Sequence, residues 1–211
     1  QDLAGNYSAV TSVVTKFDLD TPTSTVLSPS AEYVNTFISA SGEATDERLG
    51  QRVYEAGLGT YTVKVAVRMV GGNWWYATDS AFNQAEPRWY DVAVNTGPYS
   101  TGKATVTWTY DFPGNLQAAL ITNKRQDYRV VTYAYDLALN REYGQVSGEP
   151  LNAHIPAEAG RGVQFDNEIP VALTTAPANL TSQNSVPYLY GVVTDTGAIV
   201  GVQVLVKARG D

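Results

Sequence analysis

Apolar and polar residues alternate along much of this chain. From Tyr61 to Met69 every odd position is apolar or aromatic and most even positions are polar, which is typical of a half-buried strand. Gly71, Gly72 and Asn73 follow, and such residues supply the positive φ angles that a tight hairpin turn needs. We therefore expect a hairpin whose second strand covers residues 74–78.

Similar alternation, bounded by Pro, Gly, Asn and Asp clusters, predicts further strands elsewhere. They cover Tyr7–Phe17, Tyr33–Ser39, Arg52–Ala56, Arg88–Val94, Ala104–Phe112, Gln117–Thr122, Tyr128–Leu137, Val163–Phe165 and Ile169–Thr174, with a last hairpin of Tyr188–Thr194 and Ala198–Lys207. Helical patterns are poor because β-branched residues crowd the apolar segments. The best candidates for short helices are Ala44–Arg48 and Leu137–Glu142.

Many short strands separated by turn signals indicate an all-β fold: an antiparallel β-sandwich, jelly-roll-like, with little or no helix. We expect a single domain over residues 1–211. The alternative is two small β modules, residues 1–113 and 114–211, because Pro113 and Gly114 lie near the middle of the chain. No internal repeat and no long linker supports that division.

Composition and charge narrow the range of partners. The 211 residues are 44% hydrophobic and 17% charged, with no cysteine and a formal net charge of -7. This acidity disfavours nucleic acid and anionic membrane surfaces, and no apolar run is long enough for membrane insertion. The chain opens at Gln1 without a leader pattern, so we expect a mature, processed protein that is extracellular or surface-exposed.

Catalytic signals are weak, and we expect no enzymatic activity. His154 is the one histidine, and no Gly-x-Ser-x-Gly motif accompanies it. Acidic residues gather at Asp166 and Glu168 and in the segment from Glu43 to Glu47, without the context of a glycosidase pair. No cofactor is expected. A Ca²⁺ site formed by Asp166, Asn167 and Glu168 is chemically reasonable but incomplete, because such a site needs six or more oxygen ligands.

The aromatic residues between positions 74 and 90 are the most unusual feature. Neighbouring residues of a strand point to opposite faces, so Trp74 and Tyr76 share one face and Trp75 takes the other. Rings on a solvent-facing side would form a platform for sugar rings; alternatively, both faces are covered, in part by the segment Asn83–Pro87. The candidate ligand-binding residues are Trp74, Trp75, Tyr76, Asp79, Trp89 and Tyr90, assisted by Asn73 and Asn83.

Residues 61–82 resemble hairpins of secreted bacterial β-sandwich modules attached to carbohydrate-active or surface proteins, over about a tenth of the chain. Two functions follow as expectations. The first is a non-catalytic, extracellular carbohydrate-binding module that binds a glycan on the Trp/Tyr platform. The alternative is a structural subunit of an extracellular assembly, either a strand-exchanged filament or pilus or a viral capsid or spike. Copies of the chain would then form a homo-oligomer through their terminal strands.

Overall fold

The computed structural model describes most of the chain, in segments separated by gaps. The described residues are 3–6, 12, 18–46, 58, 62–95, 105–123, 126–143, 155–156, 159–178, 184–185, 188–195 and 197–207. Among them are thirteen strands and one short helix, α1 (Gly114–Thr122). The prediction of an all-β protein with little helix is confirmed.

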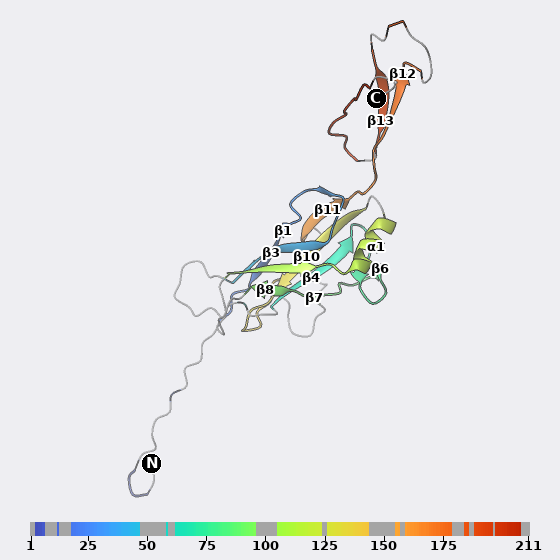
Figure 1. Cartoon of the computed structure of the whole chain (residues 1–211). Helices are drawn as coiled ribbons and strands as arrows, with labels where there is room; N and C mark the ends of the chain where they lie inside the picture. Colours follow the sequence, from blue (N-terminus) through green and yellow to red (C-terminus); the bar gives the residue numbers. More distant parts are fainter. Residues whose placement is uncertain are drawn as a thin grey trace.

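Two sheets form the body of the molecule, which comprises all described elements up to Phe165 (Figure 1). The four-stranded sheet is antiparallel and consists, in spatial order, of β1 (Thr23–Ser28), β3 (Ser39–Thr45), β9 (Thr105–Asp111) and β8 (Ala93–Asn95). The seven-stranded sheet has the order β2 (Tyr33–Val34), β11 (Arg161–Phe165), β10 (Asp127–Ala134), β4 (Val63–Met69), β5 (Trp74–Tyr76) and β6 (Ala81–Gln84), and β7 (Tyr90–Asp91) also pairs with β4. The β2–β11 pair is parallel.

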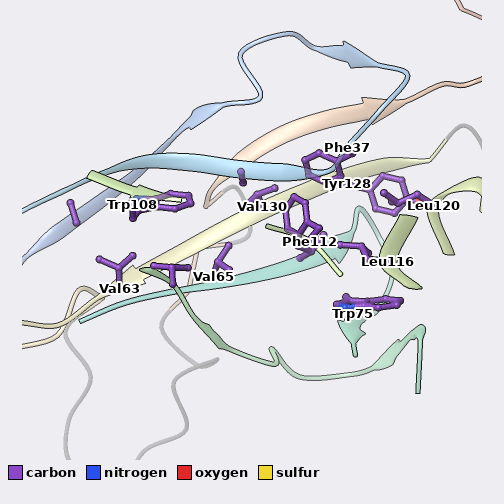
Figure 2. Close-up of a cluster of buried hydrophobic side chains, with 14 of the residues drawn as sticks. Phe37, Val63, Val65, Trp75, Trp108, Phe112, Leu116, Leu120, Tyr128 and Val130 are labelled. Carbon is purple, nitrogen blue, oxygen red and sulfur yellow. The ribbon is translucent and has the colours of Figure 1, made fainter. Parts of the chain in front are cut away.

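One hydrophobic core joins these two sheets. Trp108 of β9 and Val65 of β4 belong to the same buried cluster although they come from different sheets. Figure 2 shows Trp108 at the left of this cluster and Trp75, Leu116 and Tyr128 at its right, with Val65, Val130 and Phe112 between them. Sheets that share a core in this way are consistent with a sandwich-like arrangement.

The central strand β10 links sequence-distant parts of the chain. It pairs with the whole length of β4, from Tyr128 opposite Met69 to Ala134 opposite Val63. The two strands therefore lie on either side of position 113 in the sequence but form one ladder. Pro113 itself is the N-cap residue of α1.

The hairpin at residues 63–76 is confirmed. Strand β4 turns at Gly71, whose φ of 71° is open to glycine at little cost, and β5 follows. Strand predictions for residues 104–112, 128–137, 163–165 and 169–174 match β9, β10, β11 and β12 (Val171–Ala176), with shifted ends. Residues 88–94 instead contain two short strands, β7 and β8, and residues 33–39 form β2 and only the first residue of β3.

Several local predictions were wrong. Residues 117–122 are helical in α1, which buries Leu116, Ala119 and Leu120 at helical spacing. The segment Leu137–Glu142 is not a helix but a turn with a positive φ of 70° at Leu139, and Ala44 lies in β3. Strand β1 was not predicted.

The final hairpin also differs from the prediction. Strand β13 (Tyr190–Thr194) pairs with β12, antiparallel, rather than with residues 198–207. Those residues belong to no strand of the described part of the chain. Three predicted features lie outside the described residues: the strand Tyr7–Phe17 apart from Ser12, the strand Arg52–Ala56, and His154. No helix within the described ranges has the length and apolar character required to cross a membrane.

Candidate functional site

The predicted aromatic platform lies on a sheet that is covered on both faces. Trp75 is 1% exposed and belongs to the main core, where its ring centroid lies 5.4 Å from that of Phe82. Trp74 is 7% exposed and belongs to a second buried cluster with Ala66 and Val131. The predicted opposition of the two indoles is therefore present, but neither ring faces solvent.

Trp89 and Tyr90, which are neighbours in sequence, also pack against different clusters: Trp89 against the second cluster and Tyr90 against the main core. Trp89 is half-buried against the second cluster, with its ring centroid 6.4 Å from Trp74 and 5.6 Å from Tyr133. Tyr90 stacks on Tyr110 at 5.9 Å, and its hydroxyl accepts a hydrogen bond from the Ala77 backbone N–H at 2.9 Å. Burial raises the pKa of Tyr90 above its ordinary value, so it remains a neutral hydrogen-bonding group.

Tyr76 and Asp79 are the more accessible part of the predicted site. Tyr76 is half-buried, and the Arg88 guanidinium lies over its ring, 5.1 Å from the centroid. Asp79 accepts a hydrogen bond from Asn83 at 2.7 Å; the Gln84 amide donates to Asn83 at 2.9 Å, and Arg88 donates to Gln84 at 2.9 Å. A row of polar side chains thus runs beside one aromatic ring whose face already carries a cation.

The acidic residues predicted to bind Ca²⁺ lie where the body meets the C-terminal part of the chain. Asp166 and Glu168 line a groove of about 600 Å³ together with Asp195, which the calcium prediction did not include. The Asp166 carboxylate accepts a hydrogen bond from the Glu168 backbone N–H at 2.9 Å. The Asn167 side-chain oxygen is buried.

Carboxylates close enough to share one ion occur at a different place. Oxygen atoms of Asp18, Asp46 and Asp136 lie within 4.8 Å of one another, and the last two residues are 1% and 0% exposed. Asn140 donates hydrogen bonds from its side chain to Asp136 at 2.7 Å and to the Asp18 backbone carbonyl at 3.0 Å. These are the described side chains that could hold a hard cation, and their separation in sequence hid them from motif analysis.

A buried glutamate, Glu142, accepts hydrogen bonds from residues of both sheets. Glu142 follows β10 and accepts hydrogen bonds from the Ser24 backbone N–H at 2.8 Å, from the Ser24 hydroxyl, and from the Ala134 backbone N–H at 2.9 Å. Ser24 belongs to β1 of the four-stranded sheet, whereas Ala134 belongs to β10 of the seven-stranded sheet. Desolvation raises the pKa of Glu142, and these three hydrogen bonds oppose that rise.

The C-terminal extension, defined as residues 169–207, contrasts with these covered sites. It contains the C-terminal ribbon, formed by β12 and β13, which projects from the body (Figure 1). Thirteen of the twenty-two exposed large apolar side chains in the described residues lie in this extension, and no buried hydrophobic residue follows Phe165. They are Ile169, Val171, Leu173, Tyr188, Leu189, Tyr190, Val192, Ile199, Val200, Val202, Val204, Leu205 and Val206.

One face of the C-terminal ribbon gathers apolar side chains. Val171 lies opposite Thr194 and Leu173 lies opposite Val192, and residues that are directly opposite share a face. Tyr190 has the same parity as Val192, and its ring lies 5.8 Å from that of Tyr188. The sequence pattern predicts these strands but not their exposure, because alternation alone does not show whether an apolar face is covered.

Comparisons with models of protein families, with curated proteins and with solved structures found no match for this chain.

Proposed function

We propose that this protein is a non-catalytic structural subunit of an extracellular assembly, such as a filament or a viral shell or spike. In this proposal the C-terminal extension makes the contact between copies. The observation that carries the proposal is the contrast in burial: among the described residues no buried hydrophobic side chain follows Phe165, and thirteen large apolar side chains of the extension are exposed. Contiguous exposed apolar surface of this extent is typical of an interaction site.

The amount of exposed apolar surface supports a stable contact. Burying one fully exposed apolar side chain of this size removes roughly 60–120 Å² from water, so the thirteen, which are 42–103% exposed, offer roughly 500–1,000 Å². A specific interface of standard size buries roughly 800 Å² per partner. An isolated two-stranded hairpin is also only marginally stable in water, so the ribbon gains stability when another surface covers it.

The charge distribution supports the same function. Asp195 and Lys207 are the only charged residues between positions 169 and 207, and they cancel. The formal net charge of -7 is therefore carried by the rest of the chain. Interface centres are depleted of charge, and this distribution keeps the mutual repulsion of acidic subunits away from the proposed contact.

The test compares the wild-type protein with a variant that places charge on the ribbon. Light scattering and electron microscopy over a range of concentrations should show particles, filaments or oligomers of the wild type. The double variant Leu173→Asp and Val192→Asp should remain monomeric, because assembly would bury unpaired carboxylates. Ile121→Asp, at an exposed apolar position of α1 in the body, is the matched control and should assemble normally. A wild type that stays monomeric at every concentration would overturn the proposal.

Glycan binding is a second candidate, supported by the polar row from Asp79 to Arg88 beside Tyr76. A sugar ring would displace the Arg88 guanidinium from the tyrosine face and take hydrogen bonds from the neighbouring amides. Titration of tryptophan fluorescence with soluble polysaccharides tests this function, with Tyr76→Ala as the variant and the exposed ribbon residue Tyr188→Ala as the control. Release of shortened sugars in the same samples would contradict the non-catalytic assignment.

A further inference from the structure

We propose that the C-terminal ribbons of two copies pack face to face, so that each ribbon covers the same apolar face of the other. This inference rests on the proposed function, and it specifies both the partner, a second copy of this chain, and the contacting face. The face is formed by Val171, Leu173, Tyr188, Tyr190 and Val192, which are 53–66% exposed.

The two faces of the ribbon differ in chemistry. The face named above presents branched aliphatic and aromatic side chains. On the other face Ala172 lies opposite Val193 and Thr174 lies opposite Gly191, so that face offers one valine among smaller or polar groups. Val193 is also less exposed than Val192. Because residues of opposite parity point to opposite faces, the large apolar side chains are concentrated on one side.

The partner surface must also be apolar and free of charge. The ribbon strands β12 and β13 contain no charged residue, so an acidic or basic partner would find no complementary group. The exposed large apolar residues of the body are distributed over separate elements, such as Val70 in a turn, Ile121 in α1 and Leu139 in another turn. Within the described residues, the ribbon face is therefore the surface that best matches itself, as a two-fold interface requires.

Pairing through this face supplies the second sheet that the ribbon lacks. Two stacked sheets bury their inner side chains at a spacing of about 10 Å, and four strands with a shared core exceed the minimum for an independently stable unit. Residues 202–205 line a groove of about 310 Å³ with β12 and β13. The neutral charge of the extension leaves no local repulsion between two copies.

Single cysteines test this geometry because the natural chain contains none. Leu173→Cys should give covalent dimers with a bismaleimide of about 10 Å reach, which matches the spacing of stacked sheets. Thr174→Cys, the next residue on the opposite face, is the matched control and should give at least tenfold less dimer. Both variants are treated at a concentration where light scattering shows assembly.

The outcomes separate this inference from the proposed function. Assembly with preferential cross-linking at Cys-substituted Leu173 supports face-to-face pairing. Assembly with equal cross-linking of both variants, or with cross-linking only through Thr174→Cys, overturns it while leaving the subunit function intact. Cross-linking by Val204→Cys without Leu173→Cys would instead assign the contact to residues 199–206 as an exchanged strand and would also overturn it. Absence of assembly by the unmodified protein overturns both.

Discussion

The body and the C-terminal extension contain strands with similar alternating sequences, but their apolar residues are buried in the body and exposed in the extension. In β4 the apolar residues Val63, Val65 and Val67 are at most 1% exposed, because the strand lies between neighbours and under a second sheet. In β12 of the extension Val171 and Leu173 alternate with the same period and are 62% and 64% exposed. Alternation specifies which side chains share a face, whereas burial depends on a second layer, and the extension does not supply that layer itself.

The largest expected difference concerns hydrogen exchange. Amides of β4 and β10 should exchange only through global unfolding, at a free energy of roughly 5–15 kcal/mol. Amides of β12 and β13 should exchange with an opening free energy near zero in dilute protein, because a two-stranded ribbon is marginal. Mass spectrometry at low and high protein concentration measures both. Higher concentration should slow exchange only in the ribbon, and equal protection of ribbon and body in dilute protein would contradict the contrast.

The second largest difference between the two regions is expected for the loss of unfolding free energy on truncating a side chain. Trp75→Ala removes a 1%-exposed indole and should lower the free energy of unfolding by about 3–5 kcal/mol, since the truncation leaves a cavity. The control is Leu205→Ala in the extension, at a position that is 86% exposed. This substitution should change the free energy of unfolding by less than about 0.5 kcal/mol. Urea unfolding in dilute protein, followed by circular dichroism, measures both; effects of equal size would show that the extension packs as tightly as the body.

Glu142→Gln should have an intermediate effect and change the pH dependence. Burial raises the native pKa of Glu142 above its ordinary value of 4.5, so the native protein binds this proton more tightly than the unfolded chain. The resulting contribution to stability is complete below the unfolded pKa and is lost as pH rises through the native pKa. Urea unfolding at successive pH values should show that the variant lacks this decline.

Glu142→Gln should also lower the free energy of unfolding by about 1–3 kcal/mol. The glutamine NH₂ group would face a donor that hydrogen-bonds to the carboxylate in the wild type, and two donors cannot bond to each other. The exposed residue Glu32 offers the control Glu32→Gln, which should keep the wild-type pH profile. If Glu142→Gln also kept that profile, the carboxyl would not be the titrating group.

The smallest effect is expected at the surface of the body. Lys64 forms an ion pair with Asp91, and the two side chains are 28% and 59% exposed. Asp91→Asn should reduce the free energy of unfolding by less than about 1 kcal/mol, because solvent and salt screen such pairs. Urea unfolding at low and high salt measures the loss, which should shrink with added salt. Asp111→Asn, also at an exposed position, serves as the control.

Local structure could be predicted where the determining residues are neighbours in sequence. The hairpin around Gly71 followed from alternation and turn chemistry within one short stretch. The error at residues 117–122 came from giving weight to the β-branched pair Ile121 and Thr122. Leu116, Ala119 and Leu120 have the spacing of one helix face, so the correct signal was present and a longer window would have detected it.

Nonlocal features could not be predicted in this way. Nothing in sequence spacing brings Glu142 to Ser24, 118 residues away, or Asp18 to Asp46 and Asp136. The two faces of the aromatic strand followed from parity, but the covering of Trp74 depends in part on Ile155 and Ala159, which pack against its cluster from a distant segment. The choice of β12 as the partner of β13, against the adjacent residues 198–207, is likewise a competition between pairings that a local turn signal does not decide.

The ribbon of only two strands has a consequence for the order of events during assembly. Folding of the body is a unimolecular process, since its core closes within one chain, whereas covering the ribbon in the proposed pairing requires a collision between two chains. Mass action then sets a threshold in protein concentration. At concentrations below the dissociation constant the two ribbon strands would open readily, and at higher concentrations pairing would hold them together. The protein would in this way postpone pairing until folded subunits had accumulated, with concentration itself as the trigger.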